Sequence, residues 1–148
     1  WGTERYDLIR DWQKNNAIDM VEAGADLIVG AHSHCLQGID YINGVPVCYS
    51  LGNFLFNSNT QDTALLTLTL DTSCADSVDI DSLQFVPCIQ SGGRTVEASE
   101  NDWARIIRYE QGISYYAKFD ENGFVTYSST NMNTQNGQNT SPMRIKSE

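Results

Sequence analysis

Apolar positions over residues 8–23 recur at three- and four-residue spacing, which predicts an amphipathic helix. Asp7 is the expected N-cap, because its short side chain can accept a hydrogen bond from the first helical turn. Gly24 is expected just past the C-terminal end, where a left-handed backbone is common. The apolar side of this helix is formed by Leu8, Ile9, Trp12, Ile18 and Val21.

A short continuous apolar run with β-branched residues follows the helix at residues 26–30. Such a run predicts a buried strand, because an alternating pattern would be expected if one face met solvent. A helix, a short loop and a buried strand form the second half of a crossover unit. We therefore expect the first strand of that unit to lie before residue 1.

The middle of the chain predicts an antiparallel run of strands. Residues 36–42 and 45–50 flank Asn43-Gly44, the strongest two-residue hairpin signal, and residues 51–54 form a glycine-containing loop. Residues 63–71 alternate alanine and leucines with threonines, which predicts an amphipathic strand. A further strand is expected within residues 77–90, ending at Pro87-Cys88, and residues 91–93 then break the chain.

The last third of the chain predicts a second helix over residues 101–113, followed by a hairpin of residues 114–118 and 124–128. Trp103, Ile106 and Ile107 form the apolar side of that helix. From Ser128 onward the sequence is polar, which predicts a flexible tail that includes a glycosylation sequon at Asn139. We therefore expect one domain at residues 1–127 and a tail at residues 128–148.

Composition places this domain in a non-membrane, acidic class. The 148 residues are 41% apolar, with no run of 18 apolar residues, so any membrane attachment requires an anchor outside this chain. The net charge of −10 argues against nucleic acid as a partner, because phosphate binding needs clustered cations. An acidic balance is typical of soluble proteins in secreted or cell-surface settings. The first residues lack the features of a signal peptide.

Four cysteines leave two interpretations open. Cys35 and Cys48 flank a predicted hairpin, and Cys74 and Cys88 bracket a turn, so an extracellular location would permit two disulfides. The alternative is four buried free thiols that pack as small apolar groups. None of the four forms a CxxC pair, which argues against a zinc knuckle.

The chemically informative feature is His32-x-His34, directly after the predicted buried strand. Residues two apart in an extended segment point the same way, so two imidazoles can converge on one metal ion or on two neighbouring ions. Ligands in open α/β sheets usually bind at the carboxyl ends of strands. The alternative is that both histidines are surface or turn residues, because an HxH pair is a weak motif by itself.

Three stretches in order give the sequence a family resemblance. They are residues 1–4 (WGTE), residues 23–38 (AGADLIVGAHSHCLQG) and residues 49–56 (YSLGNFLF). Together they resemble the C-terminal half of the CapA (PGA_cap) family, and the likeness extends over roughly residues 1–118. This resemblance implies an α/β fold, the C-terminal part of a four-layer α/β/β/α sandwich like that of calcineurin-like metallophosphatases.

The resemblance also implies a site. His32 and His34 match the final paired-histidine motif of those enzymes, whose two divalent cations lie about 3.5–4 Å apart. It implies metal binding by both histidines, catalytic roles for Glu4 and His34, and up to two Mn, Fe, Zn or Mg ions. The family's earlier ligands lie nearer the N-terminus, so we expect the N-terminal remainder of the domain as a partner. Where the family usually carries His and Pro, this chain has Ala31 and Ser33, and Ser33 is expected to loosen the turn.

Smaller expectations concern three polar residues, each with a structural alternative. Glu4 is an acid–base group or a surface carboxylate. Asn53 touches substrate or orients a ligand, or else caps its turn. Gln37 contacts substrate or is simply a polar strand residue.

Two functions from different classes follow from these expectations. The first is a component of bacterial capsule or poly-γ-glutamate biosynthesis that acts as a metal-dependent hydrolase on an anionic polymer or a phosphoester. The second is a non-catalytic binding or assembly module that kept the fold without the metal chemistry. Both imply an extracellular or cell-surface location, with any membrane anchor in an N-terminal segment outside this chain.

Overall fold

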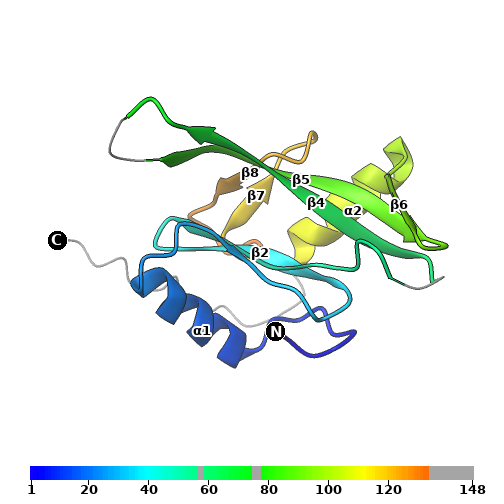
Figure 1. The fold of residues 1–148 in the computed structure, drawn as a ribbon, viewed down its shortest axis with the longest axis horizontal. Coiled ribbons are helices and arrows are strands. Elements are labelled where there is room, and N and C mark those ends of the chain that lie inside the picture. Colours follow the sequence, from blue (N-terminus) through cyan, green and yellow to red (C-terminus); the bar gives the residue numbers. More distant parts are fainter. Residues whose placement is uncertain (57–58, 75–77, 134–148) are drawn as a thin grey trace.

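Two three-stranded sheets and two helices make up most of the computed structural model, which describes residues 1–56, 59–74 and 78–133 (Figure 1). The polar segment beyond residue 133, with the sequon at Asn139, lies outside the described residues. Within the described part of the chain, neither helix is long and apolar enough to cross a lipid bilayer.

The first sheet follows helix α1 (Asp11–Glu22) and has the strand order β1-β3-β2. Strand β1 (Ile28–Val29) runs parallel to β3 (Val45–Leu51), and β2 (Leu36–Ile42) pairs with β3 antiparallel. Asn43 and Gly44 join β2 to β3 with φ values of 50° and 83°, both positive as a type I′ turn requires. The predicted hairpin is therefore confirmed.

The second sheet has the order β4-β5-β6 and is antiparallel throughout. Strands β4 (Gln61–Asp71) and β5 (Asp79–Ser91) form a long hairpin, and β6 (Arg94–Glu97) adds a short third strand. Helix α2 (Glu100–Ile113) then packs against β2, β5 and β7. The chain closes with the predicted terminal hairpin of β7 (Ala117–Phe119) and β8 (Val125–Tyr127).

Apolar side chains pack on both faces of β3, the central strand of the first sheet. On one face, Ala17 of α1 packs with Val47 and Tyr49 of β3. On the other face, Cys48 of β3 joins a larger cluster from the second sheet, α2 and the terminal hairpin. The chain is therefore a mixed α/β protein with a helix, a sheet and a second sheet in succession (Figure 1).

Helix α1 begins three residues later than predicted. Its N-cap is Arg10, whose backbone N–H donates to Gln13 Oε1 at 3.0 Å, whereas Asp7 accepts a hydrogen bond from the Tyr109 hydroxyl at 2.6 Å. Trp12, predicted on the apolar side, is 46% exposed. The C-terminal prediction is confirmed, because Gly24 has a φ of 99° just past the helix.

The strand predicted at residues 26–30 is shorter and less buried than expected. Only Ile28–Val29 form β1, which is an edge strand among the described residues. Ile28 is 8% exposed, but Val29 on the opposite face is 51% exposed. The continuous apolar run predicted a strand buried on both faces, whereas β1 is covered on one face only in this structure.

In the second half of the chain, one strand runs further than predicted, one strand was not predicted, and residues at the start of the predicted tail form hydrogen bonds with the fold. Strand β5 continues past Pro87, because this proline lies just before the residues that pair with β6, where a missing N–H costs little. Strand β6 itself was not predicted, since Gly92-Gly93 read only as a break. Residues 128–133 were assigned to the tail, yet Ser128 N–H donates to Tyr116 O and Met132 N–H donates to Tyr115 O.

None of the four cysteines forms a disulfide in this structure, so neither suggested pair is bridged. Cys48 pairs with Ile39, so Cys35 lies about four residues, roughly 13 Å, further along β2. Cys88 pairs with Thr63, at the opposite end of β4 from the segment that carries Cys74. Cα atoms more than about 7 Å apart cannot be bridged without backbone movement. The interpretation as buried thiols holds for Cys48 and Cys88, while Cys35 is half-buried and Cys74 is exposed.

Candidate metal centre

The two histidines lie in the loop that leaves β1 at its carboxyl end. Gly30 opens this loop, and its N–H donates to Cys48 O at 2.8 Å. Any Cβ on Gly30 would lie 1.9 Å from the Trp1 indole nitrogen, so only glycine fits there. That indole donates to Tyr49 O at 2.9 Å and stacks on the Tyr49 ring. The start of the loop is therefore held against β3 by Trp1.

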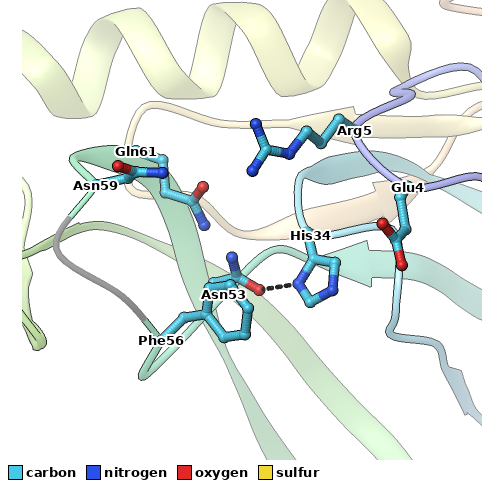
Figure 2. Close-up of a pocket in the computed structure, with 7 residues that line it drawn as sticks. All are labelled: Glu4, Arg5, His34, Asn53, Phe56, Asn59 and Gln61. Atoms are coloured by element: carbon cyan, nitrogen blue, oxygen red, sulfur yellow. Dashed lines mark hydrogen bonds between the residues drawn. The ribbon is translucent and has the colours of Figure 1, made fainter.

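Residues 1–6 run beside the histidine loop and bring Glu4 to it. The backbone N–H of Arg5 donates to Ser33 O at 2.6 Å, which ties the two segments together. The ligand atoms of Glu4, His32 and His34 all lie within 4.8 Å of one another. Figure 2 shows the Glu4 carboxylate beside the His34 ring. Glu4 and His32 are exposed, and His34 is half-buried.

The backbone of the histidine loop is unusual for residues with side chains. His32 has a φ of 92° and His34 a φ of 57°, in the left-handed region that non-glycine residues seldom adopt. Ser33 between them is fully buried, and its hydroxyl donates to Cys35 O at 2.9 Å. Burial and hydrogen bonds through its hydroxyl and its carbonyl hold Ser33 in place, and the expected loosening relative to proline stays a prediction.

Asn53 fixes the orientation of His34. The side-chain oxygen of Asn53 lies 2.7 Å from His34 Nδ1. An amide oxygen can only accept, so this contact requires the proton on Nδ1. In that tautomer His34 Nε2 keeps its lone pair free for a metal ion. The Phe56 ring, 4.8 Å from the imidazole between centroids, covers one side of it. Asn53, from the loop after β3, therefore lies where a ligand-orienting residue is needed.

Gln37 is not among the residues that line the pocket, which agrees with the alternative of a polar strand residue. It is fully buried in β2, where its Oε1 accepts from Gln13 Nε2 at 3.0 Å. Its own Nε2 donates to Tyr6 O at 2.9 Å. Gln37 thus links α1 to the segment of residues 1–6, and these hydrogen bonds hold in place the segment that carries Glu4.

A cavity of about 100 Å³ opens beside His34 (Figure 2). Its lining consists of a carboxylate, a guanidinium, an imidazole, three carboxamides and a phenyl ring. These groups belong to Glu4, Arg5, His34, Asn53, Phe56, Asn59 and Gln61. Sequence reasoning did not assign Arg5, Asn59 or Gln61 to the site, nor Phe56, whose side chain is 53% exposed. The position of Arg5 next to Glu4 was the one signal that could have identified it.

The neighbouring thiol of Cys35 is poorly suited to bind metal. Burial raises its pKa, and the carboxyl groups of Asp7 and Glu110 raise it further, while a hydrogen bond with Ser33 opposes them. Because a thiol ligand must be deprotonated, a raised pKa favours the neutral form. The donor set of the site is therefore a carboxylate and two imidazoles.

One carboxylate and two imidazoles form a donor set that suits Zn, Mn or Fe ions. This cluster is the one group of at least three such donors found in the described part of the chain. The residues present therefore fit one divalent ion. The expected second ion would need donors beyond these three side chains.

Residues 1–58 match the family model described as bacterial capsule synthesis protein PGA_cap. Over 69 residues the chain is 45% identical to the PGA biosynthesis protein CapA of Bacillus subtilis (strain 168), which covers 45% of this chain and 18% of that protein. Over 111 residues it is 36% identical to the capsule biosynthesis protein CapA of Bacillus anthracis, covering 73% of this chain and 26% of that protein. The matched regions thus span about a fifth to a quarter of these relatives.

Proposed function

Because the chain belongs to the CapA (PGA_cap) family through residues 1–58, we propose that it acts in the biosynthesis of a bacterial capsule or of poly-γ-glutamate at the cell surface. Within that role it is a metal-dependent hydrolase for a phosphoester or another anionic substrate. The observation that carries this proposal is the convergence of Glu4, His32 and His34 within 4.8 Å beside a cavity. The fold in this proposal is part of a metallophosphatase-like α/β/β/α sandwich, completed by the N-terminal remainder of the domain.

Each residue of the site has a distinct task in this proposal. His32 and His34 hold a divalent cation, and Asn53 keeps the His34 ring in the tautomer that presents Nε2. Glu4 supplies the third donor or, alternatively, exchanges a proton with the reacting water or leaving group. When bound, a divalent cation supplies Lewis-acid stabilisation of the negative charge that develops during hydrolysis.

Metal titration of the purified protein tests the cluster. With Mn²⁺ and Zn²⁺, we expect His32→Ala and His34→Ala each to weaken binding at least about tenfold, because each removes one of three donors. Asn53→Ala should weaken it about 10- to 100-fold by freeing the His34 ring. Glu100→Gln, an exposed carboxylate at the start of α2, is the matched control and should bind as the wild type does.

Glu4→Gln separates the two roles of that carboxylate. Loss of a ligand weakens metal binding, whereas loss of an acid–base group lowers turnover of a phosphodiester such as bis(p-nitrophenyl) phosphate at unchanged metal binding. If both histidine variants bind metal as the wild type does, the hydrolase proposal fails. The remaining candidate would then be the non-catalytic binding or assembly module.

A further inference from the structure

Among the described residues that line the cavity beside His34, one is an arginine or lysine, and that residue is Arg5. Figure 2 shows its guanidinium reaching across the cavity toward Gln61 and Asn59, while the Glu4 carboxylate points to the other side of His34. The carboxamides of Asn53, Asn59 and Gln61 supply neutral polar groups around it. In a chain of net charge −10, this cation is the group of the cavity that can attract an anion, and the Glu4 carboxylate opposes it.

The backbone of Arg5 is held in an uncommon conformation. Its φ is 55°, and its N–H donates to Ser33 O in the histidine loop. Among the described residues, four non-glycine residues have positive φ: Asn43 in the hairpin turn, and Arg5, His32 and His34 around this cavity. Strained backbone persists only where the surrounding contacts enforce it, and it gathers at binding and catalytic sites. The position of Arg5 is therefore part of how the site is built.

The Arg5 guanidinium has no carboxylate partner in the described part of the chain. The ion pairs found there join Arg105 to Asp62 and to Asp102. A guanidinium offers five N–H donors in a planar fork that matches the two oxygens of a carboxylate or phosphate. An exposed arginine that lines a cavity and has no ion-pair partner among the described residues is thus available to such a group.

We infer that Arg5 binds an oxyanion of the substrate, a carboxylate or a phosphate, next to the Glu4, His32 and His34 cluster, and thereby selects anionic substrates. This inference rests on the proposed function, because it assigns a substrate class to the same cavity. Arg5 is a specificity-determining residue: it holds the anion by charge and by paired hydrogen bonds.

Isothermal titration of the metal-free protein with two anions tests the inference. The probes are a short γ-linked glutamate oligomer, which carries carboxylates, and inorganic phosphate; the amidated oligomer is the neutral counterpart. We expect Arg5→Ala to lose at least tenfold affinity for one of the anions, and Arg5→Lys to lose less, because lysine keeps the charge without the fork. The anion that loses affinity identifies the oxyanion. Arg108→Ala, an exposed arginine on α2 outside this cavity, should bind both anions as the wild type does.

Two results would overturn the inference: equal anion affinity in Arg5→Ala and wild type, or equal losses in Arg5→Ala and Arg108→Ala. Glu4 repels a bound anion in the wild type and in the Arg5 and Arg108 variants alike, so this repulsion does not change the comparison of their anion affinities. A Mn²⁺ titration of each variant separates this inference from the proposed function, because Arg5→Ala should keep the metal affinity of the wild type. If Arg5→Ala loses anion binding while His32→Ala and His34→Ala keep the metal affinity of the wild type, the inference holds and the hydrolase proposal fails.

Discussion

At the scale of single residues, the site depends on side chains that never face the cavity. Gln13 and Gln37 are both fully buried and bonded to each other, and Gln37 also binds the Tyr6 carbonyl. Buried amides of this kind are costly unless every partner is present. Their hydrogen bonds fix the segment that carries Glu4 and Arg5, so buried residues outside the cavity set the position of Glu4 beside the two histidines.

Gln37→Met tests this support. The substitution conserves volume but leaves Gln13 Nε2 and Tyr6 O without their partner, so we expect about 2 kcal/mol less free energy of unfolding by urea denaturation. Because the Glu4 segment loses its anchor, Mn²⁺ affinity should fall as well. Gln84→Met, which removes an exposed hydrogen bond to Asn122 O, is the control and should change stability by less than about 0.5 kcal/mol. A stable variant with full metal affinity would contradict the supporting role of Gln37.

At the scale of elements, the contact between β2 and the end of α2 ties the two halves of the fold together. Ile39 N–H donates to Ser114 Oγ at 2.8 Å, and Tyr115 N–H donates to Ile39 O at 3.0 Å. The approach is close enough that a Cβ on Gly38 would lie 2.2 Å from the Ile113 carbonyl oxygen. Gly38 therefore allows the chain after α2 to run along β2.

Gly38→Ala should separate these elements. Its methyl group meets backbone atoms that cannot rotate away, so we expect a loss of at least about 2 kcal/mol in the free energy of unfolding. Gly24→Ala is the matched control: nothing lies within 4 Å of its Cβ position, and its cost is the conformational one of a positive φ, about 1–2 kcal/mol. A Gly38→Ala protein with wild-type stability would show that α2 can shift without cost.

At the scale of the whole molecule, the first sheet is the layer that both core clusters share, and a buried carboxyl lies within it. Asp40 of β2 is 7% exposed, and its Oδ1 accepts from Tyr41 N–H at 2.8 Å and from Tyr116 N–H at 3.3 Å. Burial raises its pKa to about 6, although both hydrogen bonds and the Lys14 charge oppose the shift. The neighbouring phenols of Tyr49 and Tyr116 also have raised pKa values, chiefly through burial.

Asp40 therefore makes global stability depend on pH. Its folded pKa exceeds the unfolded value of 3.8, so the folded state holds the proton more tightly, and stability falls as pH rises from about 4 to about 6. The full cost above that window is about 3 kcal/mol. Asp40→Asn keeps the oxygen that accepts both N–H groups, so it should match the wild type near pH 4 and exceed its stability by up to about 3 kcal/mol at pH 7.

Urea denaturation of both proteins at pH 4, 5, 6 and 7 measures this difference. Carboxyl groups other than Asp40 are common to the two proteins and cancel in the comparison. A difference that stays constant across this range would mean that Asp40 does not titrate between pH 4 and 6.

Local sequence determined the features that depend on near neighbours. The Asn43-Gly44 turn, the glycine after α1 and the helix of residues 100–113 follow from backbone preferences and short-range spacing, and the structure has them close to the predicted positions. The HxH pattern also identified two of the three donors in the cluster. Strand β6 escaped prediction, because four residues after a glycine pair carry too little pattern.

Only the tertiary structure decided which distant segments meet at the site. The chain brings Glu4 and Arg5 to the histidine loop through Arg5 N–H and Ser33 O, and it brings Asn53 to His34 from the following hairpin. It also buries Gln37, which the sequence presented as a possible substrate contact. These outcomes depend on packing and hydrogen bonds between residues far apart in the chain, and no local pattern records such contacts.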